Sequence, residues 1–167
     1  NGDIIPIITD NTWINLTTGA MCWYENDEAT YTNPYGALYN YYTVADSRNL
    51  CPAGWHVPSD TEWAELIEFL GDANNADEKL KEAGFEHWNP LGFEADNSSG
   101  FTGLPGGRRA SNGVYSSIVD QGFWWSTNEA TSATAWGRSL GYNFIGIVRN
   151  DYNKKNGNSV RCLKTVN

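Results

Sequence analysis

One strong helical pattern, at residues 59–71, is the feature from which the fold class is inferred. Ser59 and Glu62 stand three positions apart, as in a capping box, where both side chains bond main-chain amides at the start of a helix. Gly71 ends the pattern, since glycine is common directly after a helix. The sequence therefore predicts a helix after Pro58 that docks on a core through Trp63. The apolar residues at helical spacing on its buried face are Trp63, Leu66, Ile67 and Leu70.

Little helical periodicity follows beyond Trp88. Gly, Asn and Ser residues instead separate short apolar segments, which is typical of strands joined by turns. A second short helix is predicted over residues 76–83, before this half begins. A helical first part followed by a β-rich second part predicts an α+β fold. The strands are expected near residues 123–126, 133–140, 145–149 and 159–163.

Length and composition indicate one folded domain over residues 1–167. Such a chain is long enough for a single core, and its eight Trp residues are suited to one. The formal net charge is −9, and a field of this sign repels phosphate backbones, so no nucleic-acid partner is expected. No apolar run approaches the roughly 18 residues that a membrane span needs, so no direct membrane insertion is expected.

Several dense segments in a fixed order carry a family resemblance. They are Leu50–Trp63, Gly100–Gly107, Gly122–Thr127 and Ser159–Lys164, and Tyr35–Asn40 accompanies them. Together they resemble the Fibrobacter succinogenes major paralogous domain, common in surface proteins of Bacteroidetes and Fibrobacteres, from about Thr12 to Lys164. The resemblance implies a C-type-lectin-like fold, with short helices packed on irregular antiparallel sheets and a loop-rich C-terminal half. Members usually open with a further strand, which we expect to be missing here.

The family also suggests roles for the three cysteines. Cys51 and Cys162 stand at positions that are paired in relatives, so the resemblance implies a disulfide and an oxidising compartment, hence an exported protein. Cys22 is left over. It is interpreted as a buried free thiol, with a reactive or intermolecular thiol as the alternative.

No motif of an enzyme stands out. The segment Val57–Trp63 also resembles a helix start in formylglycine-generating enzymes, which share the fold but use two neighbouring cysteines near the C-terminus, where this chain has only Cys162. His56 and His87 have no zinc-site spacing, and no serine-hydrolase elbow is present. We therefore expect no catalytic residue, no metal site, no cofactor and no enzymatic activity, although twenty carboxylates leave a glycosidase-like pair open.

The stretch from Trp136 to Asn158 is the best candidate for a binding surface. Relatives commonly carry Asn or Tyr at many of its positions, whereas this chain carries other residue types. All of these types can be reached from an Asn codon by changing adenines alone, which resembles the mark of diversity-generating retroelements; ordinary divergence on a tolerant surface is the alternative. We predict ligand contacts at Ser139, Phe144, Ile145, Val148 and Asp151, with Asn143, Asn150 and Tyr152 at the rim.

These features predict a non-enzymatic, adhesin-like recognition domain on a bacterial surface or pilus, as part of a larger surface or pilus protein. Its ligand is expected to be a surface protein or a glycan, bound by a hypervariable C-terminal surface. A carbohydrate-active enzyme or its carbohydrate-binding accessory module is the alternative, and a structural spacer is a third. Exposed aromatic residues beside a polar cleft would favour sugar, a flat apolar patch would favour protein, and paired carboxylates in a deep pocket would favour catalysis.

Overall fold

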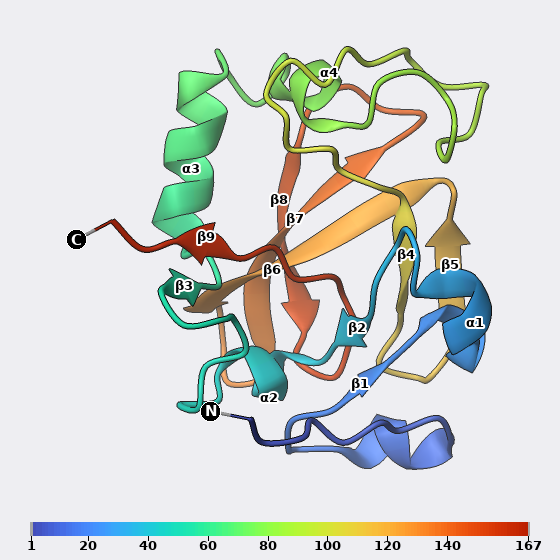
Figure 1. Ribbon diagram of the computed structural model, residues 1–167, viewed down its shortest axis with the longest axis vertical. Coiled ribbons are helices and arrows are strands. Elements are labelled where there is room, and N and C mark those ends of the chain that lie inside the picture. The colour runs from blue at the N-terminus through green and yellow to red at the C-terminus, as the bar shows by residue number, and fades with distance from the viewer. Residues whose placement is uncertain (1, 167) are drawn as a thin grey trace.

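A central five-stranded sheet organises the computed structural model, which describes residues 2–166 (Figure 1). Its strand order is β5-β4-β6-β7-β8. Neighbouring strands are antiparallel, except that β4 and β6 run parallel. Two further pairs, β1–β2 and β3–β9, are antiparallel and short. The strands are β1 (Met21–Cys22), β2 (Leu38–Tyr39), β3 (Trp55–His56), β4 (Gly106–Arg109), β5 (Tyr115–Ile118), β6 (Gln121–Glu129), β7 (Thr134–Gly141), β8 (Val148–Asn153) and β9 (Leu163–Lys164).

The helices are short and lie around the curled sheet (Figure 1). This mixed α/β architecture is compatible with the predicted α+β class. Among residues 2–166, no helix has the length and apolar character needed to cross a membrane. The helices are α1 (Glu28–Tyr31), α2 (Tyr41–Val44), α3 (Asp60–Phe69) and α4 (Ala76–Leu80), with 3-10 turns η1 (Asn11–Asn15) and η2 (Tyr24–Asn26).

Helix α3 begins as its sequence predicts. The hydroxyl of Ser59 accepts from the amide of Glu62 at 3.2 Å, and the Glu62 carboxylate accepts from the amide of Ser59 at 2.8 Å. The reciprocal bonds satisfy two amides that a helix start otherwise leaves unpaired. Trp63 is buried, and its indole donates to the carbonyl of Trp125 at 3.3 Å, which ties the helix to the central sheet.

The predicted boundaries differ from the observed ones where backbone contacts intervene. Helix α4 ends at Leu80, because Lys81 turns to extended geometry and forms a bridge with Gly103. Strand β8 begins at Val148, because Gly146 adopts a φ of +91° in the loop before it. Strands β4 and β5 were not predicted, since their glycine- and serine-rich sequences carry no strand pattern. Of the stretch 159–163, only residue 163 lies in a strand.

A disulfide joins Cys51 and Cys162, as the family resemblance implies, with 5.9 Å between the two Cα atoms. The cysteines flank the β3–β9 pair, so the bond and the strand pair together hold the end of the chain against its first third. A disulfide is compatible with an exported protein. Cys22 is the free cysteine and is buried, as one of the two interpretations expected.

Both faces of β6 pack against a core. Phe123 and Trp125 point to one side, into a cluster that includes Tyr41 and Tyr152. Trp124 points to the other side and joins the cluster beneath α3. Alternation of this kind follows from the two-residue period of a strand. The sheet is therefore a rigid frame for the loops at its ends.

Candidate functional site

The eight residues predicted to bind ligand all lie in strands β7 and β8 or in the loop that joins them. The register pairs Ser139 with Val148 and runs to Thr134 opposite Asn153. The structure divides the predicted residues into a buried pair, a loop group and an edge group. The buried pair is Ser139 and Tyr152, the loop group is Asn143, Phe144 and Ile145, and the edge group is Val148, Asn150 and Asp151.

Ser139 and Tyr152 point into the core, with exposed fractions of 5% and 6%. The ring of Tyr152 packs edge-on to Phe123 at a centroid distance of 5.8 Å. Gly137 makes room for it, because a Cβ atom there would stand 3.0 Å from the ring. Burial raises the pKa of the Tyr152 phenol. These two positions therefore serve packing, and they offer no exposed surface to a ligand.

The loop between β7 and β8 is held at both ends. The ring of Phe144 lies directly over Gly141, where a Cβ atom would collide with it. The amide of Ile147 donates to the carbonyl of Ala73 at 2.8 Å. Between these anchors Asn143 is exposed, and the side chain of Ile145 has an exposed fraction of 62%. Phe144 is thus a half-buried anchor, whereas Asn143 and Ile145 are presented to solvent.

A neighbouring loop extends this surface with residues that the sequence did not reveal. Gly92 lies so close to the loop that its Cβ would stand 2.5 Å from the carbonyl oxygen of Tyr142. Leu91 and Phe93 on either side of Gly92 are exposed, and Leu91 is 86% exposed. We call Leu91, Phe93, Asn143 and Ile145 the loop surface. In the sequence, the only sign of this contribution was the glycine at position 92 between two large apolar residues.

A strained turn adjoins the loop surface. Val119 adopts a φ of +59°, a conformation that β-branched residues rarely enter. Its carbonyl accepts from the amide of Asn89 at 2.9 Å, and the carbonyl of Asp120 accepts from the amide of Tyr142 at 3.0 Å. The turn thus ties the neighbouring loop and the β7–β8 loop to one support. Strained backbone of this kind persists only where the surroundings hold it.

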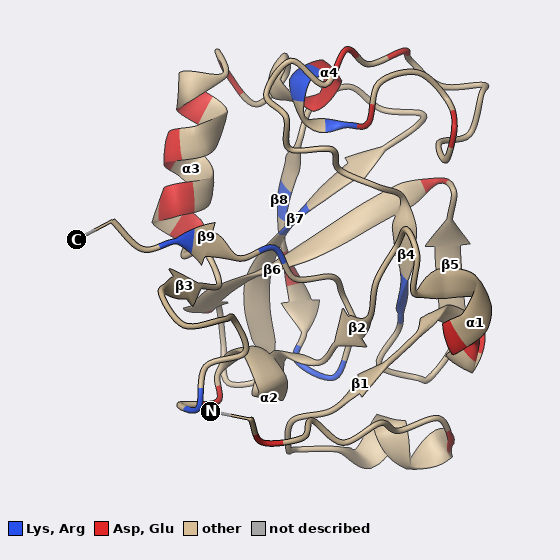
Figure 2. Cartoon of the chain, viewed as in Figure 1, with Lys and Arg blue, Asp and Glu red and all other residues tan. Residues whose placement is uncertain are grey.

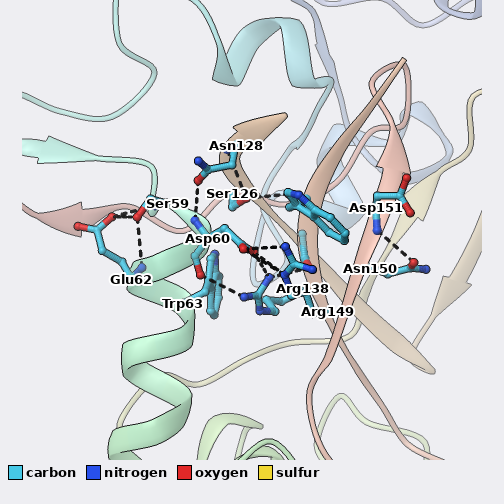
Figure 3. Close-up of polar contacts among 12 residues, drawn as sticks. Ser59, Asp60, Glu62, Trp63, Ser126, Asn128, Arg138, Arg149, Asn150 and Asp151 are labelled. Carbon is cyan, nitrogen blue, oxygen red and sulfur yellow. Dashed lines mark hydrogen bonds and ion pairs between the residues drawn. The ribbon is translucent and has the colours of Figure 1, made fainter. Parts of the chain in front are cut away.

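Beside the edge group, one carboxylate holds two arginines (Figure 3). Asp60, at the start of α3, accepts from Arg138 Nη1 at 2.7 Å and from Arg149 Nη2 at 2.9 Å. Burial raises the pKa of Asp60, but the hydrogen bonds from Arg149 and Arg138 outweigh it and hold the pKa below its ordinary value. The Arg149 guanidinium also lies 3.3 Å from the ring centre of Trp136. Figure 2 shows basic positions on β7 and β8 and acidic positions along α3.

Two surface hollows contain carboxylates that are already engaged. The first, of about 290 Å³, includes Asp3, Asp46 and Arg48. Arg48 donates to Asp46 at 2.6 Å and to Asp3 at 3.2 Å. The hydrogen bonds that Asp46 accepts from the side chain and the amide of Arg48 lower its pKa. A carboxylate with a lowered pKa is a poor general acid.

The second hollow, of about 320 Å³, lies between α3 and the C-terminal segment. Trp63, Phe101 and Arg161 line it together with Glu62. The Glu62 carboxylate already caps α3 and lies 2.8 Å from Nε2 of His56. His56 is thereby a satisfied structural residue, and Glu62 does not face a second carboxylate among the residues that line this hollow.

Glu82, Glu86 and His87 form a cluster whose potential ligand atoms lie within 4.8 Å of one another. Nδ1 of His87 lies 2.8 Å from Oε1 of Glu82, and the amide of His87 donates to Oε2 of Glu82 at 3.2 Å. Glu82 and His87 are thus already hydrogen-bonded to each other, and we assign no metal to the cluster.

Comparison with protein families matches residues 1–164 to the family described as the Fibrobacter succinogenes major domain. The match includes every segment that carries the resemblance seen in the sequence and reaches residue 1, beyond the Thr12 where that resemblance began. No curated protein and no solved structure matches the chain significantly.

Proposed function

The chain belongs to the Fibrobacter succinogenes major domain family, and from this premise we propose that it is a non-enzymatic, adhesin-like recognition domain. In this proposal the domain is exported and displayed on a bacterial surface or pilus. Its ligand binds the loop surface, next to the exposed Val148 of the edge group. The fold is proposed to be C-type-lectin-like, which the short helices around a largely antiparallel sheet and the loop-rich C-terminal half support.

The exposure of Ile145 on a loop fixed at both ends is the observation that carries the proposal. Single exposed apolar side chains are common on protein surfaces. A group of several large apolar side chains exposed together usually marks an interaction site. Here Leu91 and Phe93 are exposed on the loop that meets the β7–β8 loop where Gly92 contacts Tyr142, and Asn143 supplies hydrogen-bonding groups. Apolar anchors surrounded by polar groups are typical of the centre of a protein interface.

A protein ligand is favoured over a glycan. Sugars bind on exposed aromatic faces beside polar groups, but Arg149 already stacks on the ring of Trp136. The aliphatic character of Leu91 and Ile145 suits a protein partner better. The glycan alternative is favoured by the exposed ring of Phe93 and by the second hollow, where Phe101, Arg161 and Glu62 surround about 320 Å³. Diversification by a retroelement remains a proposal, supported by the exposure of Asn143 and Ile145 but not by the burial of Ser139 and Tyr152.

A matched pair of variants tests the proposal on intact bacterial and epithelial cells. Ile145→Asp places a charge in the loop surface, and Val114→Asp does the same at a valine that is 58% exposed in the β4–β5 turn. Because β4 runs parallel to β6, that turn lies at the opposite end of the sheet from the β7–β8 loop. We expect Ile145→Asp to weaken cell binding at least about tenfold, or about 1.4 kcal/mol, and Val114→Asp to leave it unchanged.

Treatment of the cells separates the two ligand classes. Binding that proteinase treatment of the cells removes and periodate oxidation leaves intact would support a protein ligand. The opposite result would support the glycan alternative. Equal binding by both variants would contradict a role for the loop surface.

A further inference from the structure

We propose that the outer edge of β8 pairs with β8 of a second copy of this chain, antiparallel and centred on Asn150. The proposal concerns the edge of the sheet and not the loop surface, so it goes beyond the recognition function. It is a homotypic contact between displayed copies.

The outer edge of β8 is open. β8 is the last strand of the sheet, and Val148–Asp151 are all exposed. The amide of Lys154 donates to the carbonyl of Ala133 at 2.9 Å, toward β7. The amide of Ile147 donates in the other direction, to the carbonyl of Ala73 at 2.8 Å. Amides alternate in direction along a strand, so those of odd-numbered residues in β8 point away from β7.

The main-chain groups of Arg149 and Asp151 are therefore directed outward. The amide of Asp151 agrees with this direction, because it donates to the side-chain oxygen of Asn150 at 3.0 Å and not to a main-chain carbonyl. Outside the β7–β8 ladder, the structure gives the amide of Arg149 no hydrogen-bond partner among residues 2–166. An open edge with unpaired groups is a template for another strand.

The side chains of β8 are complementary to themselves. In a two-fold pairing centred on Asn150, Arg149 stands opposite Asp151 of the second copy, and Asp151 stands opposite Arg149 of the second copy. Opposite charges directly across a strand pair are stabilising, and a two-fold axis makes each such contact twice. In the same register the outward main-chain groups of Arg149 face those of Asp151 in the second copy, so these residues form hydrogen-bonded pairs. The charges and the backbone geometry thus both favour a pairing centred on Asn150.

Arg149 retains a donor for this contact. Its Nε and Nη2 atoms bond Asp60, while Nη1 makes no hydrogen bond among the described residues. The stacking of Arg149 on Trp136 of β7 fixes the position of the guanidinium on this face of the sheet. A carboxylate from a second copy can approach Nη1 without breaking the ion pair with Asp60.

A second copy suits this edge better than an unrelated strand does. Any strand could bond the main chain, and β8 itself supplies an arginine and an aspartate two positions apart in the order that the pairing requires. One strand pair buries less area than the roughly 1,200 Å² of a stable interface, so we expect a weak dimer that forms where copies are concentrated. The net charge of −9 adds long-range repulsion, which moderate salt screens.

Cysteine trapping tests the register. Asn150 would face Asn150 of the second copy in a non-hydrogen-bonded pair, with Cα atoms about 4.5 Å apart, which is within disulfide reach. Asn150→Cys should therefore give a disulfide-linked dimer under mild oxidation. Val148→Cys is the matched control on the same strand, because the two copies of residue 148 would lie four positions out of register and should not link.

Charge exchange tests the chemistry. In sedimentation equilibrium at about 0.15 M salt, Asp151→Arg and Arg149→Glu should each weaken dimerisation at least about tenfold. Their equimolar mixture should recover it, because every cross-copy contact is then again of opposite sign. Circular dichroism checks that each variant folds. If Arg149→Glu does not fold, the cysteine-trapping experiment still tests the proposal, because it does not use that variant.

Equal linking by Asn150→Cys and Val148→Cys would overturn the proposal, as would a monomer at all concentrations up to about 1 mM. A strand from another protein bound at β8, without self-association, would also overturn it. Linking that is specific to residue 150, together with recovery in the mixture, would support it.

Discussion

Asp60 and Arg149 are joined by two nitrogen atoms of the arginine, with Nε 3.0 Å and Nη2 2.9 Å from the carboxylate. The contact connects the first residue of α3 to the edge strand, 89 positions along the chain. The same carboxylate holds the buried Arg138. One aspartate thus ties the long helix to both strands that carry the candidate binding region.

Asp60→Asn should lower the free energy of unfolding by about 3 kcal/mol, because it leaves the buried guanidinium of Arg138 without its counter-ion. Glu65→Gln, at an exposed position of the same helix, is the control and should change stability by less than about 0.5 kcal/mol. Chemical denaturation measures both. Equal effects would show that the ion pairs of Asp60 add nothing beyond surface charge.

The contribution of Asp60 should also depend on pH. Its pKa is lower in the folded protein than its ordinary value, so its stabilisation is present above the unfolded pKa near 3.9 and is lost as the pH falls through the folded pKa. The difference in unfolding free energy between wild type and Asp60→Asn should therefore be constant above about pH 5 and shrink toward about pH 2. A difference that grows on acidification would contradict the assignment.

The state of the thiols is the third prediction. Under denaturing conditions without reductant, alkylation should add one label, at Cys22, and with reductant it should add three. In the native protein Cys22 should react slowly, because it is buried and burial raises the pKa of its thiol. Intact mass measures each count. Three labels without reductant would contradict the bond between Cys51 and Cys162.

Gly92→Ala should destabilise the protein by about 1–3 kcal/mol, because the new methyl group meets the carbonyl oxygen of Tyr142 at 2.5 Å. Gly106→Ala is a fair control, since its methyl group would find no atom closer than 3.7 Å. Thermal unfolding compares the two. If Gly92→Ala folds with these loops displaced, its binding to cells should also weaken. Unchanged stability and binding would show that the loop containing Gly92 and the β7–β8 loop are independent.

The parts of the fold that local sequence determines were predicted, and those that depend on distant contacts were not. The capping box at Ser59 and the buried face of α3 follow from spacing alone. The disulfide came from the family resemblance. Strands β4 and β5 are held by pairing and not by propensity, so their sequences gave no sign of them.

The candidate site was predicted only in part, for a similar reason. The region from Trp136 to Asn158 does contain the exposed hairpin, yet two of its eight predicted residues are buried. The inward direction of Ser139 and Tyr152 depends on the register of β7 against β8, which the sequence does not display. Leu91 and Phe93 join the loop surface through the contact of Gly92 with Tyr142, between segments about 50 positions apart.

The recognition role of the loop surface is the central claim, and site-specific photo-crosslinking tests it most directly. A photoreactive phenylalanine analogue replaces Ile145 in one protein and Val114 in another, and each is irradiated on the bacterial and epithelial cells that bind the wild type. The account predicts a discrete cross-linked protein product from position 145 and none from position 114. Products of equal yield from both positions, or from position 114 alone, would contradict it.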